Sequence, residues 1–181
     1  AILRGEVLGA LSINFLLPSN TFILLNRIAE TGAKASMFGL ANFFEAAGAV
    51  TAALTAAIIA VWLRRIRASR LMAPIALALL LCLTAGIWAT IISLTVITAL
   101  VTVYNIILFS QLQREIPREK IGRIIAVVTT SSAAVMPLGN LVFSKLSTTI
   151  PTHMLIWATS ITLLAAGLVI KIGNRKHGGS V

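Results

Sequence analysis

The chain has 181 residues, of which 58% are hydrophobic and only 11% are charged, and its formal net charge is +10. Soluble domains carry about 25% charged residues, and a soluble fold of this size could not hide so much apolar surface, so the composition excludes an ordinary soluble domain. The basic residues stand in short clusters between long uncharged runs. That pattern indicates a membrane protein, because nucleic-acid binding needs a continuous basic face.

Six apolar segments follow one another along the chain, and each is long enough to cross a bilayer as a helix. They are expected at about residues 7–25, 36–63, two within 71–112 divided by a hairpin near Gly86, Ile87 and Trp88, then 121–143 and 153–170. The predicted fold is therefore all-α. A transmembrane domain of six helices spans residues 1–172, and a basic, disordered cytoplasmic tail follows at residues 173–181.

Lysine and arginine cluster on alternate connections of this arrangement. Most of them fall on one side, at Arg4, Arg64, Arg65, Arg67, Arg70, Arg114, Arg118, Lys120, Arg123, Lys171, Arg175 and Lys176. The other side carries only Arg27, Lys34 and Lys145. Because cytoplasmic loops of membrane proteins are rich in Lys and Arg, we expect both termini in the cytoplasm and the lipid bilayer as a partner.

Glu45 is the one carboxylate placed within a predicted span, about ten residues from the outer end of the second. An ionisable group at that depth is costly and by default indicates a functional site. It could carry a proton or attract a cationic substrate; alternatively, it lies nearer the interface or pairs with a basic residue. Asn42 shares its helix face, and Asn14 and Asn105 lie in other spans. These amides could line a polar pathway or simply bond neighbouring helices.

Prolines interrupt two of the predicted spans. Pro137 lies deep in the fifth span with Gly139 beside it, and Pro18 lies in the first. Proline removes one helical hydrogen bond and bends a helix, whereas glycine permits close helix approach. These residues predict bends through which a bundle opens one end and closes the other. Simple packing kinks remain the alternative.

The sequence offers no set of residues for enzyme chemistry. Its histidines are His153, at the edge of a span, and His177, in the tail, and its single cysteine is Cys82 within an apolar run. No metal-binding pair, nucleophile–base set or glycine-rich phosphate loop is present. We therefore expect a protein that is not an enzyme and that has no metal or cofactor.

The most informative segment reads EIPREKIGR from Glu115 to Arg123, followed by an apolar helix and then MPLG at residues 136–139. It resembles the junction between the tenth and eleventh helices of major facilitator superfamily exporters, above all the macrolide-efflux and enterobactin-exporter-like branch. The matching residues are Pro117, Gly122, Arg123, Pro137, Leu138 and Gly139. The start of the chain is similar to that family's seventh and eighth helices, with LLP at residues 16–18 and a small-residue helix through Gly48.

This resemblance covers nearly the whole chain and implies the C-terminal six-helix half of a twelve-helix transporter. It implies a proton-driven secondary exporter of a small amphipathic compound, drug or siderophore in the bacterial plasma (inner) membrane. A second six-helix half would come from the same chain, a separate chain or a second copy. The family often has an acidic residue where this chain reads WLRRIR at residues 62–67, so gating contacts of that residue do not carry over.

The resemblance also implies a cytoplasmic gate loop that contains Arg114, Pro117, Gly122 and Arg123. From the residues alone, a capped loop with solvated charges is the alternative, because Pro117 and the adjacent carboxylates suit the first turn of a helix. For the chain as a whole, the alternative function is a six-helix membrane scaffold or accessory subunit that transports nothing.

Overall fold

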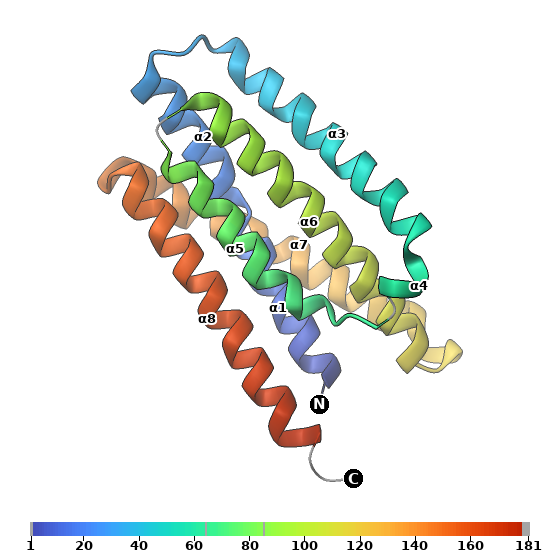
Figure 1. Cartoon of the computed structure of the whole chain (residues 1–181). Helices are drawn as coiled ribbons and strands as arrows, with labels where there is room; N and C mark the ends of the chain where they lie inside the picture. Colours follow the sequence, from blue (N-terminus) through green and yellow to red (C-terminus); the bar gives the residue numbers. More distant parts are fainter. Residues whose placement is uncertain (1, 64, 85, 179–181) are drawn as a thin grey trace.

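The computed structural model describes residues 2–63, 65–84 and 86–178, with side chains described for 5–63, 65–84 and 86–173. Within these ranges the chain is helical and contains no strand, which confirms the all-α prediction. The elements, shown in Figure 1, are α1 (Ile2–Leu16), α2 (Pro18–Thr31), α3 (Ser36–Ile58), α4 (Ala60–Leu63), η1 (Ala68–Leu71), α5 (Met72–Leu80), η2 (Leu81–Leu83), α6 (Ile87–Glu115), α7 (Arg118–Thr149) and α8 (Thr152–Gly178).

Five helical segments of the described structure are long and apolar enough to cross a membrane. They are Gly5–Thr31, Ser36–Ile58, Ile87–Glu115, Arg118–Thr149 and Thr152–Gly173. The third predicted span corresponds to Ala68–Leu83, which is apolar but shorter than the other five, which have 22 to 32 residues. In length and hydropathy, these helices are compatible with a multi-pass membrane protein.

Two of the predicted spans are interrupted. In the first, α1 ends at Leu16 and α2 begins with Pro18, which lacks the N–H that would continue the hydrogen-bond ladder. In the second, α3 ends at Ile58, and Ile59 leaves helical geometry with φ −95° and ψ 17° before the short helix α4. Pro137, by contrast, lies inside a helix that continues to Thr149.

The last helix is longer than the sequence predicts. Helix α8 continues to Gly178, into the segment from residue 173 onward for which a disordered tail is predicted. Arg175 and Lys176 in that segment have high helix propensity and suit the negative end of the helix dipole, whereas the glycine, asparagine and histidine residues beside them do not favour a helix. Residues 179–181 of the predicted tail lie outside the described part of the chain.

The apolar core lies between α1, α2, α5, α6 and α8, which we call the central bundle. Helix α8 packs against α5 and α1, and α6 packs against α5 and α2. Large side chains such as Met72, Leu94, Leu108 and Ile156 are fully buried there. Each such side chain makes many van der Waals contacts with its neighbours, so these helices hold one another firmly.

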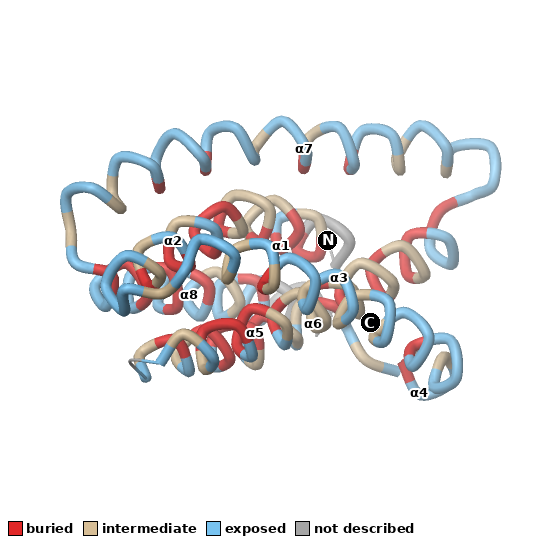
Figure 2. Tube along the Cα trace, turned by 90° about the horizontal axis from the view of Figure 1, so that it is seen from above, coloured by how far each residue is buried: buried red, intermediate tan, exposed pale blue. Residues whose placement is uncertain are grey.

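Helices α3 and α7, which we call the flanking helices, lie outside this bundle. Helix α3 packs mainly on α6, and α7 packs mainly on α1 and α2. Of the 18 most apolar consecutive residues in each segment, only 6% are buried in α3 and 11% in α7, against 50% in α1 with α2 and 44% in α6. Figure 2 shows α7 exposed along most of its length, with its few buried residues turned toward the bundle.

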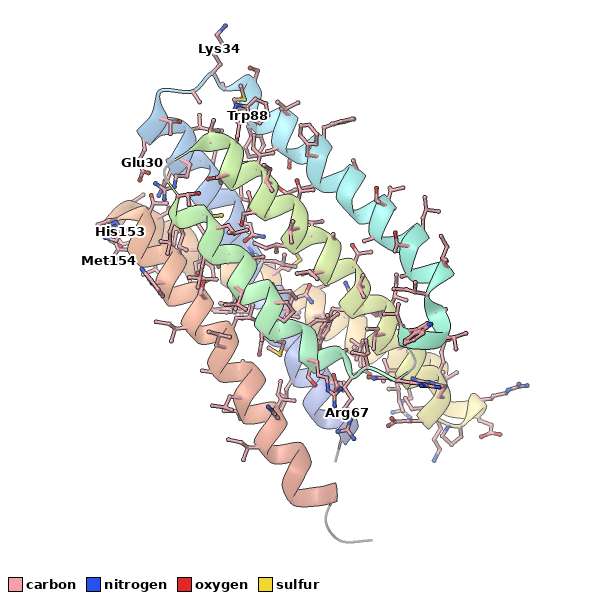
Figure 3. All side chains as sticks on the ribbon, viewed as in Figure 1. Glu30, Lys34, Arg67, Trp88, His153 and Met154 are labelled. Atoms are coloured by element: carbon pink, nitrogen blue, oxygen red, sulfur yellow. The ribbon has the colours of Figure 1, made fainter. Side chains whose placement is uncertain are left out.

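The two ends of the molecule differ in charge. The end that contains Arg67 in Figure 3 carries most of the described basic residues: Arg65, Arg67, Arg70, Arg114, Arg118, Lys120, Arg123 and Lys171. At the other end, where Lys34, Glu30 and His153 are labelled, the described Lys and Arg residues are only Arg27, Lys34 and Lys145. We call them the basic end and the opposite end. The structure thus separates the basic residues along the helix axes as the sequence predicts.

Candidate functional site

Glu45 lies on the side of α3 that faces α6. Its Oε2 accepts a hydrogen bond of 2.9 Å from the Thr98 hydroxyl, and the residue is half-buried. Gly48, almost one turn further along α3, lies against Thr95, since a Cβ at this position would come within 2.8 Å of the Thr95 methyl group. The missing side chain of Gly48 lets the two helices approach closely beside the carboxylate. Within the described residues, no Lys or Arg forms an ion pair with Glu45.

An open groove of about 490 Å³ lies between α3 and α6, from the level of Gly48 toward the basic end. Small residues such as Ala52 and Ala56 form much of its wall on α3. The hydroxyls of its threonines Thr51 and Thr55 donate to carbonyls of their own helix, at 2.8 Å each. The groove therefore offers an apolar surface, and the small residues of α3 leave it open instead of packing tightly along the whole helix.

The other predicted pathway residues are distributed over three helices. The Asn14 amide on α1 donates to Ala10 O at 2.9 Å, and the Asn42 amide on α3 donates to Phe38 O at 2.8 Å. Asn105 lies half-buried on α6, the helix that also carries Thr98. None of these hydrogen bonds joins two of the four pathway residues. Among these contacts, only the hydrogen bond between Glu45 and Thr98 joins two helices.

Two of the predicted bend residues come together. Gly139 on α7 lies against the interruption between α1 and α2, where a Cβ would overlap the carbonyl oxygen of Phe15 and lie 3.2 Å from the ring of Pro18. This contact is the close helix approach that the sequence predicts for Gly139. Pro137 is exposed one half-turn away on the same helix. The contact fixes α7 to the point at which the first pass is interrupted.

The predicted gate loop lies at the basic end, far from Glu45. Arg114 lies in the last turn of α6 and its Nε donates to Ser110 O at 3.2 Å, Pro117 precedes α7, and Gly122 and Arg123 are exposed near the start of α7. At 1.5 Å per residue, the distance along α6 from Thr98 to Arg114 is about 24 Å. The loop and the carboxylate are therefore separate features of the molecule.

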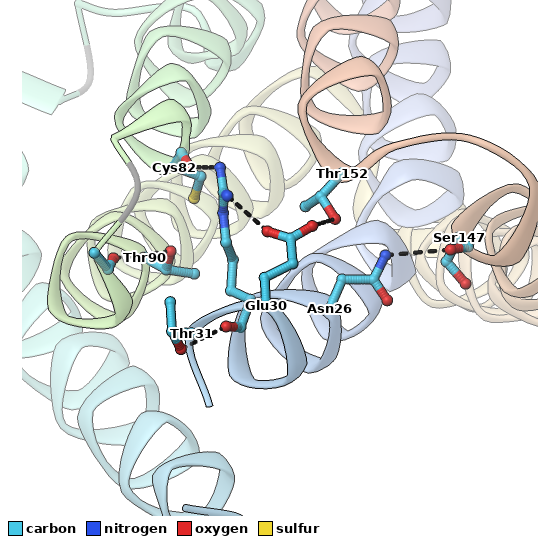
Figure 4. Close-up of polar contacts among 9 residues, drawn as sticks. Asn26, Glu30, Thr31, Cys82, Thr90, Ser147 and Thr152 are labelled. Carbon is cyan, nitrogen blue, oxygen red and sulfur yellow. Dashed lines mark hydrogen bonds and ion pairs between the residues drawn. The ribbon is translucent and has the colours of Figure 1, made fainter. Parts of the chain in front are cut away.

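A polar cluster at the opposite end was not found from the sequence. Arg27 is only 8% exposed; its Nη1 lies 2.8 Å from Glu30 Oε2, and its Nη2 donates to Cys82 O at 2.7 Å. The Thr152 hydroxyl donates to the other Glu30 oxygen, as Figure 4 shows. The cluster ties the end of α2 to η2 and to the start of α8. The spacing of Arg27 and Glu30, three residues apart on one predicted helix face, is the signal that could have found it.

A second buried carboxylate lies at the basic end. Glu6 is 1% exposed, and its two oxygens accept hydrogen bonds of 2.8 and 2.9 Å from the backbone N–H and the hydroxyl of Ser69. The Tyr104 hydroxyl donates to the Glu6 backbone oxygen at 2.8 Å, above Gly9, where a Cβ would crowd it. Glu6 therefore caps the start of the η1–α5 segment from a neighbouring helix. A buried role for Glu6 is not predicted from the sequence, because the first expected span begins one residue later, at residue 7.

These contacts define helices fixed to one another at both ends and a carboxylate midway along a flanking helix. Among the described residues, no group of three or more His, Cys, Asp and Glu is arranged to hold a metal ion. No protein-family model, curated protein or solved structure matches the chain. The class that the fold defines is an all-helical protein whose long apolar helices are compatible with a multi-pass membrane protein.

Proposed function

We propose that this chain is one six-helix half of a secondary active exporter. The five long apolar helices and the shorter segment Ala68–Leu83 make six passes through the bacterial plasma (inner) membrane, with the basic end in the cytoplasm. The exporter moves a small amphipathic compound outward in exchange for protons. The observation that carries the proposal is the position of Glu45 on a flanking helix, bonded to Thr98 and without an ion pair in the described structure.

A charged carboxylate at that depth is energetically unfavourable, so its presence favours a functional role. Glu45 is the tenth residue of α3, about 14 Å from its start at 1.5 Å per residue, near the middle of a bilayer core of about 30 Å. A carboxylate there can bind a proton, or it can hold a cationic group of a substrate. If proton and substrate compete for Glu45, the entry of one drives the release of the other, which is antiport.

The exposed flanking helices support the need for a second half. Large apolar residues of α3, including Phe43 and Val50, are 65% and 61% exposed, although the helix carries the proposed site. A second six-helix unit against α3 and α7 would enclose Glu45 between two halves. The packing of α3 on α6 parallels that of α7 on α1 and α2, with α5 and α8 behind, as expected for two three-helix repeats. The order of the exporter-like motifs at residues 115–123 and 136–139 adds to this support.

The alternative function is a scaffold or accessory subunit that transports nothing. The exposed apolar faces of α3 and α7 favour it equally, because any partner protein in the membrane could cover them. Glu45 separates the two functions, since a scaffold has no use for a titratable group at this position.

The test measures transport of a cationic dye in energised inverted vesicles from cells that produce the chain. We expect Glu45→Gln to abolish pH-gradient-driven uptake and Glu45→Asp to keep part of it, because the titratable group survives. Glu119→Gln, which changes an exposed carboxylate of the basic end, is the matched control and should transport normally. Equal transport by wild type and Glu45→Gln across a pH series contradicts the coupling role. No transport by wild type above empty-vector vesicles favours the scaffold when cross-linking shows that the chain is assembled with a second six-helix unit in those vesicles.

A further inference from the structure

The connection between α3 and η1 presents its residues alternately outward and inward. Trp62 is 73% exposed, and Arg65 and Arg67 are exposed as well. Between them, Leu63 is buried and Ile66 packs against the core, and the next residue, Ala68, is completely buried. We call the outward set, Trp62, Arg65 and Arg67, the basic corner. An indole and two guanidinium groups therefore project from a segment whose other side is anchored in the protein.

Hydrogen bonds link the described residues of this segment to one another, to α6 and to α1. The backbone N–H groups of Arg65 and Ile66 donate to Trp62 O and Leu63 O at 3.1 and 3.0 Å, which makes two successive turns. The Gln111 side chain on α6 donates to Ile66 O at 3.1 Å, and Glu6 accepts from the Ser69 backbone beyond. The two arginines thus start from fixed backbone positions, which lowers the entropic cost of binding a ligand.

The surface that leads to the basic corner is apolar. Leu54 and Ile58, one turn apart on the same face of α3, are 65% and 84% exposed, and Val61 in α4 is 68% exposed. Along the chain, an apolar strip is followed by the indole of Trp62 and then by the arginines. A phospholipid presents the complementary order, with acyl chain, glycerol region and phosphate, and indoles favour the glycerol level.

We infer that the basic corner binds the phosphate headgroup of an anionic phospholipid in the leaflet at the basic end, with its acyl chain along Ile58 and Val61. Arginine suits a phosphate because its planar fork donates two parallel hydrogen bonds. Within the described residues, neither Arg65 nor Arg67 forms a close ion pair; the charge of Arg67 acts on Glu6 without direct contact, so both guanidinium groups can still bind a phosphate. The inference rests on the membrane insertion proposed above but not on transport.

The experiment uses the full chain with Trp62 as its only tryptophan, in the double variant Trp88→Phe/Trp157→Phe, reconstituted into vesicles. Brominated phosphatidylglycerol in a phosphatidylcholine background is compared with brominated phosphatidylcholine in a phosphatidylglycerol background, at equal mole fraction of the quencher. We expect stronger quenching of Trp62 by the brominated anionic lipid. Each arginine should contribute up to about a five-fold local enrichment, falling as salt is raised. Arg65→Gln/Arg67→Gln should remove the difference.

Two controls separate the possible causes. A chain with Trp88 as its only tryptophan reports from the opposite end (Figure 3) and should be quenched equally by both lipids, which shows insertion without preference. Arg118→Gln/Lys120→Gln removes the same charge from the start of α7, which lies apart from α4 in Figure 2, and should leave the preference of Trp62 intact.

Four outcomes would overturn the inference while Trp88 still shows insertion. They are equal quenching of Trp62 by both lipids, a preference that survives Arg65→Gln/Arg67→Gln, and a preference abolished by soluble glycerol phosphate at millimolar concentration, which would identify a site for free phosphate. The fourth is a Trp62 shielded from both lipids, which would show that a partner protein covers the corner. Absence of quenching at Trp88 would contradict membrane insertion itself.

Discussion

The central bundle and the flanking helices have similar composition but are held in place differently. In the bundle, buried side chains such as Leu94 and Met72 interlock, and polar groups occur where they tie one helix to the next, as Arg27 and Glu6 do. On α3, most of the apolar surface is exposed, and the carboxylate of this helix, Glu45, lies midway along it and accepts a hydrogen bond from Thr98. The extent of burial therefore distinguishes a helix that packs inside this chain from one that leaves most of its apolar surface exposed.

The largest expected effect tests this difference directly. Leu94→Ala, in the bundle, should lower the free energy of unfolding by about 2–5 kcal/mol, because it leaves a cavity among fully buried neighbours. Leu54→Ala, on the exposed face of α3, should change it by less than about 0.5 kcal/mol. Thermal unfolding in detergent can be followed with a thiol-reactive dye, since Cys82 is the only cysteine and is buried. Equal destabilisation by both substitutions would mean that α3 is covered in the isolated protein.

A smaller effect is expected where α7 meets the bundle. Gly139→Ala should cost about 1–3 kcal/mol, since the added methyl group overlaps the Phe15 carbonyl and α7 must shift outward. Gly122→Ala, on the same helix with open space around the added methyl group, should be neutral or stabilising by up to about 1 kcal/mol. Melting curves of the two variants provide the measurement. A neutral Gly139→Ala would show that α7 is not fixed to the α1–α2 interruption.

The third prediction concerns the cap at the basic end. Glu6→Gln replaces one of two accepting oxygens by an NH₂ group that faces donors from Ser69, so we expect a loss of about 1–3 kcal/mol. Hydrogen exchange should rise at the start of the η1–α5 segment, which Glu6 caps. Glu119→Gln, an exposed carboxylate at the same end, is the control and should leave both quantities unchanged. Unchanged exchange in Glu6→Gln would show that Ser69 needs no cap.

The smallest effect on stability is expected at the proposed functional residue. In Glu45→Gln the side-chain carbonyl can still accept the hydrogen bond from Thr98, so the free energy of unfolding should change by less than about 1 kcal/mol. The same variant is expected to lose transport, so that function and stability separate at this position. A loss of several kcal/mol would instead make Glu45 a structural residue of the α3–α6 contact.

Helix positions were predictable because charges and apolar runs alternate clearly along the sequence. The hairpin expected near Gly86, Ile87 and Trp88 agrees with the start of α6 at Ile87. The sequence also marks Pro18 and Gly139 as special positions, and the structure brings these two residues into contact. The interruption at Ile59 was not predictable, because residues 58–63 read as a continuous apolar run. The sequence predicts too short an α8, because the basic, polar segment from residue 173 onward is typical of a disordered tail, whereas the positive charges of Arg175 and Lys176 suit the C-terminal end of a helix.

The candidate site was predictable only in part. Glu45 was recognisable because an isolated carboxylate stands out in an apolar segment, but its partner Thr98 lies 53 residues away and depends on which helices pair. The same limit hid the Glu6–Ser69 contact, which spans 63 residues. Spacing within one helix is visible in a sequence, whereas pairing between helices depends on packing over the whole chain.

The pairing of α3 with α6 and of α7 with α1 and α2 has a consequence for biosynthesis. Helix α3 emerges from the ribosome well before α6, so Glu45 has no partner on α6 until that helix has been synthesised. Helix α7 is synthesised late and packs on α1 and α2, which are synthesised first. Each half of the chain thus supplies the partner of a helix in the other, and neither a fragment ending at η2 nor one beginning at α6 should assemble by itself. Contacts so distant in sequence slow folding, and during that delay an insertase or chaperone would be most useful to this chain.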